Sequence, residues 1–171
     1  ALEVAMAVEN GADEVDIVLN VGRMLTGEYD EAANEVEVIR TEMDEDVVLK
    51  VIIESGALKT PELIRKASLL SMLAGADFVK TSTGKIDVAA TPEAAVVMCQ
   101  AIRDYYDKTG RKVGFKAAGG VRTAEDAALY YTIVEEILGK EWLTTELFRI
   151  GASSAANNIL SAIEGSEVKY F

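Results

Sequence analysis

The stretch DFVKTSTGK (residues 77–85) decides the fold, because it places a charged residue where a buried strand should continue. Asp77, Phe78 and Val79 begin as a buried β-strand would, and Lys80 then interrupts the run before a series of small residues. A fully buried parallel strand is usually almost purely apolar. The other apolar runs of the chain share this feature.

Five short apolar runs alternate with helical patterns along the chain. The runs are EVDIVLN (14–20), VVLKVIIE (47–54), DFVKTS (77–82), KVGFKAA (112–118) and LFRIGAS (147–153), and they recur every 30 to 35 residues. The helical patterns between and after them cover residues 29–43, 61–74, 92–106, 124–138 and 154–164. Regular alternation at this spacing predicts parallel strands joined by right-handed crossovers.

Two α/β architectures have this alternation, an open doubly wound sheet and a (β/α)8 barrel. The five runs each carry a charge: Asp16, Lys50, Lys80, Lys116 and Arg149. Charged side chains that point inward near the C-terminal ends of strands suit a barrel interior with its active site at that end. We therefore favour a (β/α)8 TIM barrel. Because such a barrel needs eight strands in about 250 residues, we expect residues 1–171 to form a single domain that contains only the last five β/α units, without the first three strands.

Composition excludes several classes of function. A formal net charge of −12 would repel DNA, RNA and anionic membranes, and no run approaches the length of a membrane span. The absence of histidine excludes Ser-His-Asp and Cys-His catalysis and histidine-ligated metals, so acid–base chemistry would fall to Asp, Glu, Lys, Tyr or water. The single cysteine, Cys99, lies in an apolar run, which predicts a buried core residue and fits a reducing, cytoplasmic location.

Two glycine-rich stretches follow the last two predicted strands: AAGGVRT (117–123) and IGASS (150–154). Small residues let backbone N–H groups approach phosphate oxygens, and the N-terminus of a following helix favours negative charge. In barrels the loops after strands seven and eight are a frequent phosphate site. We therefore predict phosphate binding here, against the alternative that these glycines only make tight turns.

The stretch STGK (82–85) is not a nucleotide P-loop. A Walker A motif needs glycine where this chain has Val79, and Ser or Thr where it has Ile86. Lys85 could still bring positive charge to a phosphate, or be an ordinary exposed lysine.

Lys80 and Lys116 occupy matching positions near the C-terminal ends of neighbouring predicted strands. In a structural interpretation each is neutralised by an acid such as Asp16 or Glu54, but buried ion networks can often be replaced by apolar residues without loss of stability. In a catalytic interpretation, two neighbouring ammonium groups in a poorly solvated site favour loss of a proton. A partly neutral lysine forms a Schiff base with a carbonyl, and Asp16 would assist proton transfer. We favour the catalytic interpretation.

The motifs GADEVDIVLNVG, LKVIIESG, GADFVKTSTGK, VGFKAAGGVRT and RIGASS resemble, in order and spacing, the strand motifs of the 2-deoxy-D-ribose-5-phosphate aldolase family. The resemblance runs from residue 1 to about residue 163. It implies a class I aldolase on a (β/α)8 barrel that cleaves 2-deoxy-D-ribose 5-phosphate to acetaldehyde and D-glyceraldehyde 3-phosphate, without a metal or other cofactor. It also implies a small phosphorylated sugar as the substrate and a homodimer as the assembly.

Carried over to this chain, the resemblance makes Lys80 the Schiff-base nucleophile and Lys116 the residue that shifts the ionisation of Lys80. Asp16 would join Lys116 and a water molecule in a proton relay. Lys50 resembles the interior lysine of the preceding strand and is expected to be structural. The phosphate would be surrounded by Gly84, Lys85, Gly119, Gly120, Gly151, Ser153 and Ser154.

The chain departs from the family pattern in two ways. The family has three strands before EVDIV, and no motif in residues 1–171 corresponds to them. Some members also use a flexible C-terminal tyrosine near the active site, and the tail of this chain does not match theirs. Tyr170 could serve in that role, or could simply be part of a frayed end. Two alternatives to an active aldolase stay open. In the first, residues 1–171 are a barrel fragment that is inactive alone. In the second, the chain belongs to a sugar-phosphate-binding or isomerase barrel without covalent chemistry, and this second alternative does not explain Lys80 and Lys116.

Overall fold

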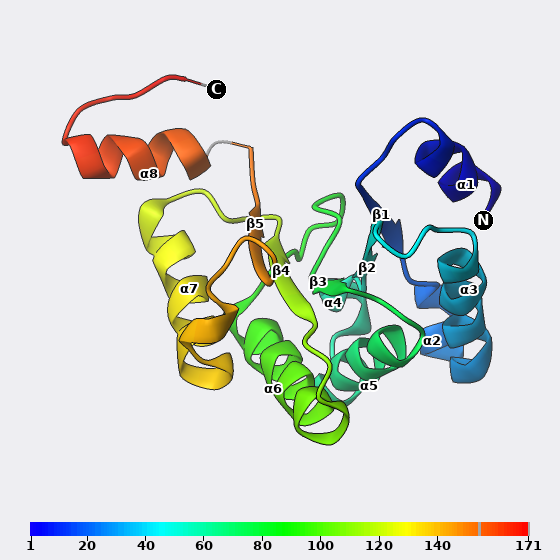
Figure 1. The fold of residues 1–171 in the computed structure, drawn as a ribbon. Helices are drawn as coiled ribbons and strands as arrows, with labels where there is room; N and C mark the ends of the chain where they lie inside the picture. Colours follow the sequence, from blue (N-terminus) through cyan, green and yellow to red (C-terminus); the bar gives the residue numbers. More distant parts are fainter. Residues whose placement is uncertain (154, 171) are drawn as a thin grey trace.

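Five parallel strands form one sheet in the order β1-β2-β3-β4-β5 in the computed structural model, which describes residues 1–153 and 155–170 (Figure 1). The strands are β1 (Glu14–Val18), β2 (Val48–Ile52), β3 (Phe78–Lys80), β4 (Gly114–Ala118) and β5 (Phe148–Gly151). Each lies inside one of the five predicted runs, and every pairing is parallel. The predicted parallel architecture is therefore confirmed.

Helices connect the strands along the chain. They are α1 (Leu2–Glu9), α2 (Val21–Thr26), α3 (Tyr29–Thr41), α4 (Ser55–Leu58), α5 (Pro61–Leu73), α6 (Pro92–Thr109), α7 (Ala124–Leu138) and α8 (Ala155–Glu164), with a short 3₁₀ helix at Lys140–Trp142. Of these, α3, α5, α6 and α7 lie along the outer side of the sheet, whereas α1 and α8 lie beyond its two edges (Figure 1). The five predicted helices are α3, α5, α6, α7 and α8. The short α2, α4 and 3₁₀ helices were not predicted.

Threonine caps fix where the long helices begin. The side chains of Thr60, Thr91 and Thr123 accept hydrogen bonds from backbone N–H groups of the first turns of α5, α6 and α7. Proline follows the first two of these caps at the first helical position, where it removes no needed donor. The strand-to-helix turns at the C-terminal end of the sheet are thus well defined by sequence.

The inner face of the sheet carries the charged residues. In the strand register Asp16 lies opposite Lys50, Lys80 opposite Lys116, and Lys116 opposite Arg149. Side chains at matching positions of parallel strands point to the same face. The charges found in the five runs therefore meet on one surface, as the interior of a barrel requires.

A glycine makes room for the aromatic residue on this face. A Cβ atom on Gly114 would lie 2.3 Å from the Phe78 ring, and Phe78 is only 2% exposed. The ring therefore lies over the neighbouring strand. Lys50 Nζ lies 6.0 Å from the centroid of this ring.

The apolar core lies between the sheet and the outer helices. Its fully buried members include Val51, Met98, Cys99, Phe115 and Trp142. The prediction of a buried Cys99 is confirmed, and burial raises the pKa of its thiol far above the ordinary value. Across residues 1–153 and 155–170, no helix has both the length and the apolar character needed to cross a membrane.

Candidate active site

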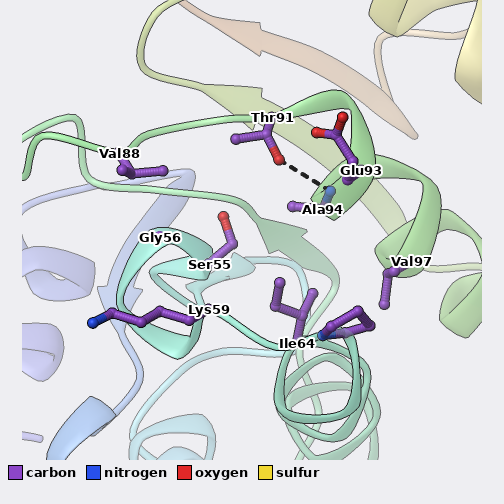
Figure 2. A pocket seen from close by; sticks show the side chains of 10 residues that line it. Ser55, Gly56, Lys59, Ile64, Val88, Thr91, Glu93, Ala94 and Val97 are labelled. Carbon is purple, nitrogen blue, oxygen red and sulfur yellow. Dashed lines mark hydrogen bonds between the residues drawn. The ribbon is translucent and has the colours of Figure 1, made fainter.

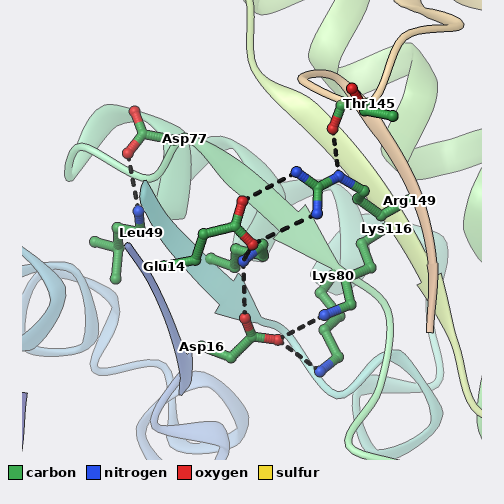
Figure 3. A network of polar contacts seen from close by, with 9 residues as sticks. Glu14, Asp16, Leu49, Asp77, Lys80, Lys116, Thr145 and Arg149 are labelled. Carbon is green, nitrogen blue, oxygen red and sulfur yellow. Dashed lines mark hydrogen bonds and ion pairs between the residues drawn. The ribbon is translucent and has the colours of Figure 1, made fainter. Parts of the chain in front are cut away.

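One carboxylate oxygen holds both predicted catalytic lysines. Asp16 Oδ2 lies 2.8 Å from Lys80 Nζ and 2.9 Å from Lys116 Nζ. Figure 3 shows the two ammonium groups converging on this carboxylate from neighbouring strands. The lysine side chains are only 14% and 19% exposed, so the three groups interact largely outside bulk water. The structure therefore brings Asp16, Lys80 and Lys116 into contact, as the sequence analysis expected.

A second layer of ion pairs supports Asp16. Lys50 Nζ lies 3.2 Å from Asp16 Oδ1 and 2.6 Å from Glu14 Oε2. Arg149 Nη2 in turn lies 3.0 Å from Glu14 Oε1, and its Nε donates to the carbonyl of Thr145 (Figure 3). Four cationic side chains thus face two carboxylates. The interior is locally positive in a chain whose net charge is −12.

Both carboxylates in the network are held in the ionised form. Burial of Asp16 opposes ionisation, but the hydrogen bonds and charges of Lys80 and Lys116 outweigh it and hold the pKa of Asp16 well below its usual range. The hydrogen bond from Lys50 lowers the pKa of Glu14, with further lowering by Arg149 against the effect of burial. Asp16 is therefore an anion in the free protein, where it holds the two lysine ammonium groups and does not itself carry a proton to donate.

Lys116 is easier to deprotonate than an ordinary lysine. Burial lowers its pKa, and the charges of Lys80 and Lys50 lower it further, while the hydrogen bond and charge of Asp16 act in the opposite direction. A lysine of this kind can accept and return a proton with less difficulty than an exposed one.

A cavity of about 480 Å³ opens where β3, β4 and β5 end. Lys80 and Lys116 line it from the strands. The predicted phosphate residues that also line it are Gly84, Lys85, Gly119, Gly120, Gly151 and Ser153. The cavity therefore brings the lysines and the glycine-rich loops together, whereas the predicted Ser154 lies outside the described residues.

The loops of this cavity depend on glycine where they touch. A Cβ atom on Gly119 would lie 2.6 Å from Ala89 Cβ and 3.2 Å from Gly84 Cα, and both glycines have positive φ angles, +81° and +76°. A Cβ atom on Gly151 would lie 3.3 Å from Lys116 Cε. The glycines allow the two loops to contact each other, and they leave room for the Lys116 side chain beside Gly151.

Sequence reasoning missed two polar residues of the cavity, Thr83 and Arg122. Both lie within the motifs STGK and AAGGVRT, so their positions next to the predicted glycines were a usable signal. Arg122 adds a cationic side chain to the lining, which suits an anionic ligand. Tyr170, by contrast, is 72% exposed, and its backbone N–H donates to Asn157 Oδ1.

A second cavity, of about 380 Å³, lies between α4, the starts of α5 and α6, and the loop that precedes α6 (Figure 2). Ile64, Val88, Ala94 and Val97 give it a largely apolar lining. The first cavity, with its lysines, is the better candidate for a phosphorylated ligand.

Comparison with known proteins agrees with this geometry. The sequence profile of the DeoC/LacD family of aldolases matches residues 1–157. The chain is 50% identical over 157 residues to a deoxyribose-phosphate aldolase of Mus musculus, a match that covers 92% of this chain and 49% of the relative. The chain thus spans about half the length of that curated relative.

Solved structures share the fold. One titled QR15, an aldolase, has a TM-score of 0.73 at 28% identity and matches 95% of this chain and 66% of its own. A tetrameric deoxyribose phosphate aldolase from Aeropyrum pernix has a TM-score of 0.68 at 26% identity, covering 95% of this chain and 60% of its own. The five parallel strands with alternating helices accordingly have the architecture of a partial (β/α)8 barrel, the fold class that the sequence predicted.

Proposed function

Because the chain belongs to the DeoC/LacD family of aldolases, we propose that it carries the catalytic residues of an enzyme that cleaves 2-deoxy-D-ribose 5-phosphate to acetaldehyde and D-glyceraldehyde 3-phosphate. The observation that carries the proposal is the pair of lysines, Lys80 and Lys116, whose Nζ atoms lie 2.8 and 2.9 Å from the same oxygen of Asp16. A non-covalent sugar-phosphate site would need positive charge, but it would not need two amines on one carboxylate beside the ligand cavity.

In this proposal Lys80 is the nucleophile. Its neutral amine adds to C1 of the open-chain sugar, and loss of water gives a protonated Schiff base. Asp16 retains Lys116 and Lys50 as partners when Lys80 becomes bound to the substrate, so its charge stays compensated. The shared carboxylate thus supports covalent chemistry on one lysine without leaving a buried charge unpaired.

Carbon–carbon cleavage then requires one proton to be removed. A base takes the proton of the C3 hydroxyl, the C2–C3 bond breaks, and the electron pair flows into the Schiff base to form an enamine. D-glyceraldehyde 3-phosphate leaves, a proton is added at C2, and hydrolysis releases acetaldehyde and the free amine. The lowered pKa of Lys116, caused mainly by burial, supports a role with Asp16 and water in moving these protons.

The phosphate of the substrate would lie against Gly84, Lys85, Gly119, Gly120, Gly151 and Ser153. The shared cavity supports this assignment, because it joins these residues to the lysines. Arg122 on the same lining supplies additional positive charge. Phosphate binding would then hold C1 of the sugar beside Lys80.

Borohydride trapping with acetaldehyde, followed by peptide mass mapping of the full-length protein, tests the proposal. We expect a reduced two-carbon adduct on Lys80. An adduct on Lys116 would exchange the roles of the two lysines. No adduct on either lysine would overturn the covalent mechanism and favour a binding or isomerase barrel.

Testing residues 1–171 alone in the same way addresses whether this part of the barrel is active without further segments. A homodimer and a cytoplasmic location remain predictions, to be checked by analytical ultracentrifugation and by fractionation of cells that express the protein.

A further inference from the structure

Glu54 combines a rare backbone conformation with a buried acidic side chain. It follows β2 with φ 54° and ψ 59°, in the left-handed region that residues other than glycine rarely adopt. The residue is 6% exposed, and its carboxylate makes no ion pair within residues 1–153 and 155–170. A buried charge without a cation and a strained backbone are both unfavourable, so other contacts must compensate for them.

The carboxylate of Glu54 is bonded to the loop that follows β3. Thr83 donates to it twice, from its backbone N–H at 3.2 Å and from its hydroxyl at 2.5 Å. The Thr83 hydroxyl oxygen also accepts from the backbone N–H of Lys85 at 3.1 Å. Glu54 therefore fixes Thr83, and through one hydroxyl it fixes the turn that contains Gly84.

The backbone on either side of Glu54 is tied to the same strand. The N–H groups of Ile53 and Ser55 donate to the carbonyls of Lys80 and Thr81, at 3.0 and 2.8 Å. The left-handed conformation of Glu54 lies between these two bonds. This conformation directs the Glu54 side chain to Thr83. With the regular alternation of an extended strand, the side chain would instead point to the inner face that carries the lysines.

A second contact holds α4 against the same loop further on. A Cβ atom on Gly56 would lie 2.0 Å from the carbonyl oxygen of Val88, so only glycine allows this approach. Figure 2 shows Val88 above the α4 turn that contains Gly56. The segment after β2 thus holds both ends of the loop that carries Gly84 and Lys85.

We propose that Glu54 is a positioning residue that selects phosphorylated substrates, by holding the Thr83–Lys85 turn in the shape that receives the phosphate. The inference rests on the proposed function, because it takes this turn as part of the phosphate site. Thr83, Gly84 and Lys85 all line the cavity, whereas Glu54 does not. Its effect must therefore pass through Thr83.

Two variants remove the link in different ways, and both are to be made in the full-length protein. Glu54→Gly removes the carboxylate and also relieves the backbone strain, since glycine adopts positive φ freely. Thr83→Val keeps the shape of the side chain and removes the hydroxyl. Each should raise KM for 2-deoxyribose 5-phosphate, and the Kd for inorganic phosphate by calorimetry, about tenfold, as expected for loss of a charge-assisted hydrogen bond.

The discriminating measurement is turnover of unphosphorylated 2-deoxyribose. Its kcat/KM should change less than about threefold in Glu54→Gly, because Glu54 does not line the cavity and the lysines are untouched. Thr83→Ser keeps the hydroxyl and should restore phosphate affinity. Lys59→Gly is the matched control, because Lys59 is the one further non-glycine residue with a positive φ, 63°, in residues 1–153 and 155–170. It should leave the ratio of the two substrates unchanged.

The outcomes separate this inference from the proposed function. Equal losses on both sugars, or unchanged phosphate affinity in Glu54→Gly and Thr83→Val, would overturn it, as would a wild-type protein that does not bind inorganic phosphate. If Glu54→Gly does not fold, Glu54→Gln decides, because it keeps the length of the side chain and removes the charge that accepts the two hydrogen bonds from Thr83. Absence of a borohydride adduct would defeat the aldolase mechanism alone, and weakened phosphate binding in the variants would still support the role of Glu54.

Discussion

Arg149 Nη2 on the last strand of the sheet lies 3.0 Å from Glu14 Oε1 on the first, although β1 and β5 are not hydrogen-bonded neighbours. In a flat sheet, four spacings of about 4.8 Å would separate these strands by about 19 Å. The side chains of a glutamate and an arginine are together too short to span this distance and form an ion pair. The contact therefore requires the sheet to curve so that β1 and β5 approach each other. Such curvature is expected of a barrel and not of an open doubly wound sheet.

Replacing Glu14 should destabilise the protein more than replacing Arg149. Glu14→Gln leaves Lys50, whose side chain is 3% exposed, with Asp16 as its one acidic partner among the described residues. Breaking a buried pair costs about 3–5 kcal/mol, and we expect about 2 kcal/mol here because one partner remains. Arg149→Gln removes only a partly exposed pair, worth about 1 kcal/mol or less. Urea unfolding of the two variants measures the difference, and equal or reversed losses would contradict it.

Lys80→Leu should abolish catalysis and leave the phosphate site intact. Without the amine no Schiff base forms, so we expect kcat/KM to fall by at least about 10³-fold. Binding of inorganic phosphate, measured by calorimetry, should stay within about twofold, since the cavity loops are unchanged. Lys85→Leu should behave in the opposite way, with a normal borohydride adduct and a raised KM. Residual turnover in Lys80→Leu near the wild-type rate would remove Lys80 from its assigned role.

Lys116→Leu should move the pH–rate profile to higher pH. Removing Lys116 takes one positive charge away from the Lys80–Asp16 pair, and a nearby positive charge makes it easier for an amine to lose its proton. The rising limb of kcat/KM against pH reports the free enzyme. A limb that keeps its position while the rate falls would mean that Lys116 acts only in proton transfer.

Stability should decline in acid because of Asp16. The folded state holds the pKa of this carboxyl well below its usual range, so the unfolded chain binds more protons as pH falls. The stabilisation is complete above the ordinary value of about 3.9 and is lost as pH falls below it. Urea midpoints should therefore drop as the pH falls from about 4 towards about 2, and Asp16→Asn should show a shallower drop from a lower starting stability. Parallel slopes in both proteins would rule out this linkage.

The sequence predicted the regular elements well because they depend on local signals. Threonine and proline at 60–61 and 91–92 mark helix starts, and alternating apolar runs mark strands. The short α2 and α4 helices escaped prediction, because four to six residues show no periodicity.

Partner choice within the site depends on backbone geometry that the sequence does not reveal. Asp16 and Glu54 were equal candidates to neutralise the lysines, and only Asp16 does so. Alternation assumes an extended backbone, whereas the left-handed φ of Glu54 turns its carboxylate to Thr83. Likewise, the curvature that brings Arg149 to Glu14 belongs to the whole sheet and to no single run.

Gly119→Ala should impair phosphorylated substrate more than Gly120→Ala does. Both glycines have nearly the same positive φ, +81° and +83°, so alanine introduces similar backbone strain at each. They differ in the space around them. A Cβ atom on Gly119 would lie 3.2 Å from Gly84 Cα and 2.6 Å from Ala89 Cβ, whereas no atom of the residues that the structure describes lies within 4 Å of one on Gly120. The Gly119 variant must therefore push the two cavity loops apart. We expect its KM for 2-deoxyribose 5-phosphate to exceed that of the Gly120 variant by about tenfold, with similar melting temperatures. Equal KM values would mean that contact between the loops does not shape the phosphate site.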